Sequence, residues 1–222
     1  MSNKEPLQIF LSCGRTYTSR QEDFVVALEN YLKARNCQHR TPGRNYESVD
    51  QPVKAARDLI GQCDGVVVVA FERIRALTGI EMPGSPNEKH LPEERHPTVW
   101  NQIEAAMGYG QHVPILTLVE KGLRRQAMLS DRFEWWAQET DLNVDFLRSQ
   151  RFTQAFEQWI ERIEERKQKP RISESDLAKL PIWQFLGLLT PAQLWSTLAA
   201  LFAVIAGVAV IAYKLGDFFH KT

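Results

Sequence analysis

The run Gly65-Val-Val-Val-Val-Ala-Phe71 decides the fold, because it is apolar at every position and β-branched through its middle. A strand without a polar face is buried on both sides, as in a parallel sheet that helices cover on each face. Two further apolar runs, residues 7–12 and 113–119, have the length of buried strands. We predict that the three runs share one sheet, with 65–71 as a central strand.

Helical spacing of apolar residues separates and follows these strands. The expected helices are 19–32 behind a Ser19–Glu22 capping box, 52–62 with Pro52 in the first turn and Val53, Ala56 and Ile60 facing inward, 100–110 begun by Thr98, and 152–163 with Phe152, Phe156, Trp159, Ile160 and Ile163 on its apolar face. Residues 36–46 are predicted to be a loop or an edge strand. Residues 79–97 hold four prolines and two glycines, which predicts a long loop over one end of the sheet. Strands alternating with helices place a ligand site at the carboxyl ends of the strands.

Composition and charge limit the possible partners. The 222-residue chain carries 27 basic and 27 acidic residues, so its net charge favours neither nucleic acid nor an anionic membrane surface, and we expect no nucleic-acid partner. Cys13, Cys37 and Cys63 lack the CxxC and Cys/His spacings of metal sites, which predicts reduced thiols and no metal. Residues 1–6 are polar and do not resemble a secretory signal, so we expect the folded part in the cytoplasm.

The C-terminal region has the composition of a membrane anchor. No charged residue occurs between Leu180 and Tyr213, and the predicted transmembrane helix, 194–214, is long enough to cross a bilayer once. Trp195 and Tyr213 lie near its two ends, as aromatic residues do at membrane boundaries. The expected parts are an α/β domain over 1–166, a polar tether over 167–180, an interfacial segment over 181–193, the helix, and a short tail over 215–222. The charges that flank the predicted helix do not settle its orientation in the membrane. The alternative to a membrane-spanning helix is a helix buried in the protein core.

Small side chains recur every fourth residue in this predicted helix, at Ala199, Ala203 and Gly207. Such a stripe lets two membrane-spanning helices approach closely. It predicts a homo-oligomer, and the alternative is the ordinary abundance of small residues in membrane helices.

One segment carries the chemistry: Trp100-Asn-Gln-Ile-Glu104-Ala-Ala-Met-Gly-Tyr-Gly-Gln-His-Val-Pro114-Ile. It resembles the third helix and the following strand of Toll/interleukin-1 receptor (TIR) domains, which are related to nucleoside 2-deoxyribosyltransferases. Ile9-Phe-Leu-Ser12 resembles the opening strand of that family, Pro42-Gly-Arg-Asn-Tyr46 its second-strand loop, and Asp64-Gly-Val-Val-Val-Val-Ala70 its third strand. The resemblance covers about residues 6–165. It implies an α/β, flavodoxin-like parallel sheet with helices on both faces.

In the catalytic branch of the TIR family, the resemblance implies cleavage of the nicotinamide–ribose bond of NAD+, which is a substrate and not a cofactor. Glu104 matches the catalytic glutamate. Breaking this bond builds positive charge on the ribose, which a nearby carboxylate stabilises, and nicotinamide leaves without needing a second acid. Trp100 lies one turn earlier, where it would wall the pocket. Phe10, Ser12 and Arg15 end the first strand and are predicted to contact the substrate, Arg15 through the pyrophosphate.

Each assignment has a plainer alternative. Glu104 is otherwise a solvated helix residue and Trp100 a core aromatic, while Arg44 and Tyr46 belong either to a self-assembly loop or to a plain turn. Together, the resemblance and the predicted membrane helix indicate a membrane-anchored NAD+-consuming effector of bacterial antiphage defence, assembled through its TIR-like domain. The alternatives are a non-enzymatic adaptor that recruits other TIR-like domains, and a nucleotide sensor whose transmembrane helices are the effector.

Overall fold

Five parallel strands form the central sheet of the protein in the order β2-β1-β3-β8-β9. The computed structural model describes residues 5–130, 137–168 and 195–196. The strands are β1 (Leu7–Cys13), β2 (Cys37–Arg40), β3 (Gly65–Ala70), β8 (Ile115–Glu120) and β9 (Gln138–Thr140). Counting these strands alone, the order is 2-1-3-4-5, which is the order of flavodoxin-like sheets. The predicted α/β parallel sheet is therefore confirmed.

The central position of β3 follows from its side chains. Val67 and Val69 point into the core on one face of the sheet, and Val66 and Val68 point into the core on the other. All residues of β3 are buried, so a polar residue at any position would lose its hydration on either face. The predicted strands 7–12 and 65–71 are confirmed to within a residue. The predicted strand 113–119 begins two residues later, at Ile115.

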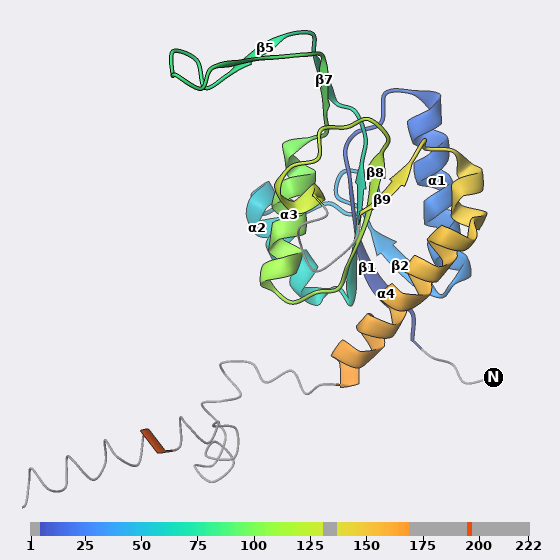
Figure 1. Cartoon of the computed structure of the whole chain (residues 1–222). Coiled ribbons are helices and arrows are strands. Elements are labelled where there is room, and N and C mark those ends of the chain that lie inside the picture. Colours follow the sequence, from blue (N-terminus) through green and yellow to red (C-terminus); the bar gives the residue numbers. More distant parts are fainter. Residues whose placement is uncertain (1–4, 131–136, 169–194, 197–222) are drawn as a thin grey trace, which may run out of the picture. The chain divides into compact units, whose positions relative to one another are not determined.

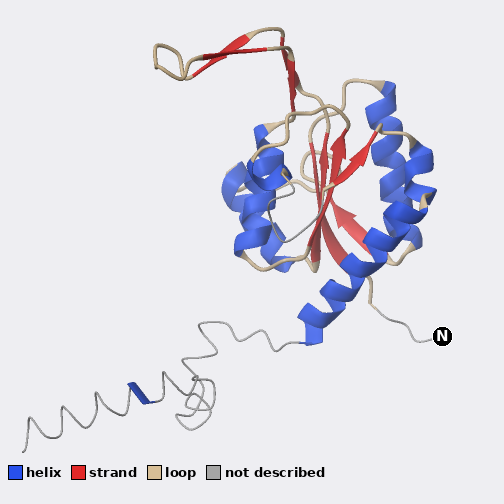
Figure 2. Cartoon of the chain, in the orientation of Figure 1, coloured by secondary structure: helices blue, strands red, loops and turns tan. Residues whose placement is uncertain are grey.

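Two helices cover each face of the sheet (Figure 2). The helices are α1 (Ser19–Ala34) and α4 (Gln150–Gln168) on one face, and α2 (Pro52–Gln62) and α3 (Val99–Gly110) on the other. The first pair packs aromatic residues, with Tyr31 edge-on to Phe152 and Phe156. The second pair packs small residues, including Ala56 and Ala105, so α2 and α3 lie close to the sheet.

Local details of two helices differ from the sequence predictions. The N-cap of α1 is Thr18, whose hydroxyl accepts from the backbone N–H of Gln21, so the predicted Ser19–Glu22 capping box is wrong by one residue. Glu22 instead pairs with Arg44. In α2 the predicted range is confirmed, but Val53 is exposed because it lies in the first turn, beyond the edge of the core. Thr98 caps α3, as predicted.

Residues 74–96 form an arm of two antiparallel ribbons, which takes in most of the long loop predicted over 79–97. The ribbons pair β4 (Ile74–Ala76) with β7 (Glu94–His96) and β5 (Gly79–Glu81) with β6 (Lys89–Leu91). The prolines that suggested a loop fall outside the strands, where no ladder hydrogen bond is lost. Figure 1 shows the arm extending away from the sheet.

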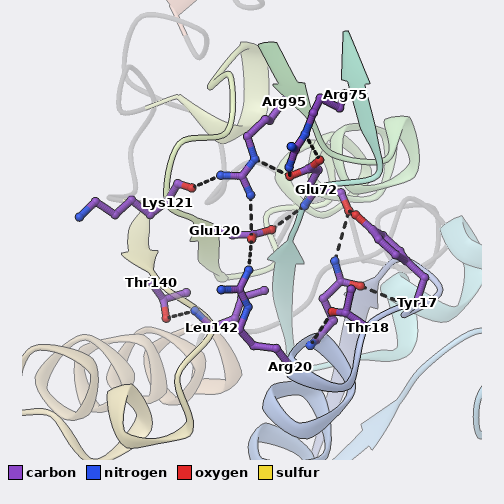
Figure 3. A network of polar contacts seen from close by, with 11 residues as sticks. Tyr17, Thr18, Arg20, Glu72, Arg75, Arg95, Glu120, Lys121, Thr140 and Leu142 are labelled. Atoms are coloured by element: carbon purple, nitrogen blue, oxygen red, sulfur yellow. Dashed lines mark hydrogen bonds and ion pairs between the residues drawn. The ribbon is translucent and has the colours of Figure 1, made fainter. Parts of the chain in front are cut away.

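An ionic network around the buried Glu120 holds the root of the arm to the sheet (Figure 3). Arg95 on β7 donates to Glu72, which follows β3, and to Glu120 at the end of β8, the latter over 2.9 Å. Glu120 is only 4% exposed and also accepts from Arg20 on α1 over 3.1 Å and from the backbone N–H of Glu72 over 2.7 Å. The arm is thus joined to the carboxyl ends of two neighbouring strands.

The predicted membrane region belongs to a second unit of the chain. Contacts divide the chain into two units, Met1–Lys169 and Pro170–Thr222. Helix α4 continues to Gln168, two residues into the predicted tether. Within residues 5–130, 137–168 and 195–196, no helix has both the length and the apolar character that a bilayer crossing requires. The predicted interfacial segment lies outside the described residues, as does the predicted helix 194–214 except for Trp195 and Ser196, so the stripe of Ala199, Ala203 and Gly207 stays a prediction.

Candidate functional site

A cleft of about 450 Å³ opens at the carboxyl ends of β1 and β3, on the side of α2 and α3. Four segments line it. They are the end of β1 (Cys13, Gly14 and Arg15), the connection into α2 (Pro42, Gly43, Tyr46, Glu47, Ser48, Asp50 and Pro52, with Ala55 and Ala56), Arg73 after β3, and the start of α3 (Thr98, Trp100 and Glu104). Ligands of open parallel sheets bind at this edge, next to the point where the strand order reverses.

Glu104 lies in this cleft from the second turn of α3 and is only 8% exposed. Burial raises the pKa of its carboxyl group from 4.5 to about 7, because an ionised carboxylate loses hydration there, and the nearby Ser12 hydroxyl offsets part of the effect. A carboxyl group with a pKa near neutrality, in a cleft, is typical of functional sites. The alternative of a solvated helix glutamate is wrong.

Ser12 lies close to Glu104 and is held by a residue that sequence reasoning missed. Asn101 on α3 is 1% exposed, and its Nδ2 donates to the Ser12 hydroxyl over 3.0 Å. The same amide nitrogen approaches the backbone oxygens of Ser12 and Val69 at 3.4 Å. Asn101 therefore joins the start of α3 to the ends of β1 and β3. Its position three residues before Glu104, on the same helical face, was the available signal.

The other predicted site residues divide between cleft and core. Trp100 lines the cleft and is 39% exposed, so it is not a core aromatic. Arg15 also lines the cleft. Phe10 is completely buried, packs with Ala56 in the core beneath α2, and is not one of the cleft-lining residues. The physical reason is depth: Phe10 faces the same side of β1 as Ser12 but lies one pleat further from the strand end.

Three further residues lie at or near the cleft: Cys13, Arg44 and Tyr46. Burial raises the pKa of the Cys13 thiol to about 12, so the thiol stays protonated and is a poor nucleophile at neutral pH. Arg44 pairs with Glu22 and Glu29 of α1, at 2.8 and 3.1 Å, within a turn that begins at Thr41 and has Gly43 at a φ of +72°. Tyr46 follows that turn and lines the cleft.

The polar groups of the cleft suit an organic ligand that carries both positive and negative charges. Arg15 and Arg73 provide cations, and Glu47, Asp50 and Glu104 provide carboxyl groups. Within the parts of the chain that the structure describes, no three His, Cys, Asp or Glu side chains gather as metal ligands would. The cleft itself offers charged side chains, one buried carboxyl group and an aromatic wall.

Comparison with known proteins adds no family to these observations. No protein-family model matches the chain, and no curated protein matches its sequence.

Proposed function

We propose that the chain is an NAD+ glycohydrolase that cleaves the nicotinamide–ribose bond, with Glu104 as its catalytic residue. The observation that carries the proposal is a single buried carboxyl group, with a pKa raised to about 7, that lines a cleft at the carboxyl edge of the sheet. The resemblance of the segment from Trp100 to Pro114 to TIR domains supports NAD+ as the substrate.

The proposed reaction needs little more than this carboxylate. As the bond to nicotinamide breaks, its electron pair leaves with the base, and the ribose carbon becomes positively charged. Ionised Glu104 stabilises that charge, and its effect is strong because burial lowers the local dielectric constant. Water then adds to the ribose carbon, so NAD+ and water yield ADP-ribose, nicotinamide and one proton. The cationic nicotinamide ring favours the ionised form of Glu104 when substrate binds.

Two observations favour this enzyme over the adaptor. Residues 74–96 contribute none of the side chains that line the cleft, so the arm leaves the cleft open. Glu104 is buried in the cleft and not turned to bulk water. An adaptor that uses its outer surface for recruitment has no requirement for a carboxylate held at an energetic cost, whereas catalysis does.

The proposed setting is a membrane. A helix over 194–214 would concentrate copies of the domain in one plane, with its cytoplasmic domain in reach of NAD+, and self-association would raise the effective concentration of the domains. In a bacterial cell, activation of such an effector would deplete NAD+ and halt phage replication. Carbonate extraction of membranes tests the anchor: the full chain should stay in the membrane pellet, and a chain ending at residue 180 should be released.

Nicotinamide release tests the activity directly. The full chain, concentrated or bound to lipid vesicles, is incubated with NAD+, and products are separated by chromatography. Glu104→Gln and Glu104→Ala should lower nicotinamide release at least about 100-fold, since they remove the charge that stabilises the transition state. Glu161→Gln is the matched control, because Glu161 is an exposed glutamate on α4, on the opposite face of the sheet. No release by the wild-type chain, or equal release by wild type and Glu104→Ala, would reject the proposal.

A further inference from the structure

Most arginine side chains of the described residues already have an acceptor. Carboxylates hold Arg20, Arg35, Arg44, Arg57, Arg75, Arg95, Arg124, Arg125 and Arg148, and amide or backbone oxygens hold Arg40, Arg151 and Arg166. Within residues 5–130 and 137–168, the exceptions are Arg15, Arg73 and Arg162. All three side chains are exposed, and Arg162 lies on α4, whereas Arg15 and Arg73 both line the cleft beside Glu104.

The two cleft arginines come from adjacent strands. Arg15 follows β1 and Arg73 follows β3, and Cys13 pairs with Val69 at the ends of these strands. Thr98, the N-cap of α3, lines the same cleft, so the positive end of that helix dipole also faces it. Two guanidinium groups and a helix N-terminus around one cleft favour an anionic group of the ligand there.

Apart from Glu104, the carboxyl groups of the cleft come from the segment on the β2 side. Glu47 and Asp50 belong to the segment between β2 and α2, and β2 is the edge strand on the far side of β1 from β3. Lys54 pairs with Asp50 at 2.8 Å, which offsets the negative charge of that side chain. The charge of the cleft therefore changes from acidic near the β2 edge to basic near the end of β3.

The backbone at Arg73 is held in place by the root of the arm. The N–H of Arg73 donates to the backbone oxygen of His96 over 2.8 Å, directly before β4 begins. The preceding residue, Glu72, binds Arg75 and Arg95. A residue whose backbone is already ordered loses less conformational entropy when its side chain binds a ligand.

We propose that Arg73, together with Arg15, binds a phosphate group of the substrate, so that the cleft selects nucleotides over the matching nucleosides. The inference rests on the proposed function in taking this cleft as the substrate site. It goes further in assigning Arg73 and in requiring a phosphate. Guanidinium groups bind phosphate through paired, charge-assisted hydrogen bonds, and a nucleoside offers no group to replace them.

ADP-ribose and adenosine are the probes, because they share the nucleoside and differ in the diphosphate. Titration calorimetry on the full chain in detergent measures both ligands with wild type, Arg73→Met, Arg15→Met and the control Arg162→Met. We expect wild type and Arg162→Met to bind ADP-ribose alike. Arg73→Met should lower the affinity for ADP-ribose about 10- to 100-fold and leave the affinity for adenosine unchanged. Arg73→Lys keeps the charge but loses the paired geometry, so its affinity for ADP-ribose should lie between those of wild type and Arg73→Met.

Thermal melting checks that each variant is folded. The proposal is overturned if wild type binds ADP-ribose no better than adenosine, if it binds neither, or if Arg73→Met matches Arg162→Met. Nicotinamide release from NAD+, measured on the same samples, separates the two proposals. A chain that binds ADP-ribose through Arg73 but releases no nicotinamide keeps this inference and rejects the glycohydrolase. Nicotinamide release by Arg73→Met with the KM of wild type keeps the glycohydrolase and rejects the phosphate-binding role of Arg73.

Discussion

Asn101 on α3 donates a hydrogen bond of 3.0 Å to the hydroxyl of Ser12 on β1, and this bond joins the helix that carries Glu104 to the strand beside it. Because Asn101 occupies one lone pair of the Ser12 oxygen, it orients the hydroxyl that lowers the pKa of Glu104. The catalytic carboxyl group of the proposed enzyme is thus tuned by a residue with no place in the cleft lining.

Removing this bond should alter both stability and the pH dependence of catalysis. Asn101→Ala should lower the free energy of unfolding by about 1–3 kcal/mol, because buried acceptors lose their donor. It should also move the acidic limb of the pH–rate profile to higher pH, because Ser12 is no longer held. Gln102→Ala is the control, since among the described residues the Gln102 side chain bonds Gln126 and Met128 and not Ser12. Equal shifts of the limb in both variants would contradict a specific role for Asn101.

The activity of the wild-type chain should depend on ionisation of Glu104. Its pKa of about 7 predicts that kcat/KM for NAD+ rises about tenfold per pH unit below that value and levels off above it. Initial rates of nicotinamide release at low substrate concentration measure this limb. A flat profile through neutrality would show that no such group controls the reaction.

The folding stability should also depend on the ionisation of Glu104, but in the opposite direction from activity: it should fall as pH rises. The pKa of Glu104 is raised in the folded state, so the folded chain holds its proton more tightly and loses stability as pH rises from 4.5 to about 7. Above that range, Glu104→Gln should be more stable than wild type by up to roughly 3 kcal/mol, and the difference should vanish below it. Urea unfolding at both ends of the range measures the effect, and equal differences at both would contradict it.

The root of the arm should depend on Glu120 more than on any exposed ion pair. Glu120→Ala removes a buried acceptor from Arg20, Arg95 and the Glu72 backbone, which should cost about 3 kcal/mol of unfolding free energy. It should also expose the arm to limited proteolysis. Arg75→Ala is the control: its side chain is 51% exposed, and its loss should cost under about 1 kcal/mol. Similar losses in the two variants would mean that burial of Glu120 does not matter.

Close packing between the sheet and α4 should make Gly65 intolerant of a side chain. A Cβ at this position would lie 2.5 Å from Trp159 and 2.6 Å from Ile163, so Gly65→Ala should lower the unfolding free energy by about 2 kcal/mol or more. Gly110→Ala is the matched control, because among the described residues no atom outside its own helix lies within 4 Å of its Cβ position. Denaturant midpoints distinguish the two, and a Gly65→Ala chain as stable as Gly110→Ala would contradict this packing.

Local pattern was enough to predict three strands of the sheet and the four helices that cover it. An uninterrupted apolar run such as β3 has one low-energy placement, between two helical layers, and Pro52 and Thr98 mark helix starts through chemistry within one turn. Strand β9 escaped prediction because its three residues show no apolar run. The arm escaped because prolines between short strands resemble the prolines of a loop.

The sequence by itself determined the α/β class, the central strand and the position of Glu104 on a helix beside the strand ends, because these depend on neighbours within a few residues. Only the tertiary structure decided that Phe10 lies too deep for the cleft and that Asn101 bonds Ser12. It alone also decided that Arg73 and Arg15 line the same cleft. Such relations depend on which residues meet across the fold, as Arg20 and Glu120 do across 100 positions of the chain. The physical reason is that burial and ion pairing are set by packing between distant segments, which periodicity along one segment does not encode.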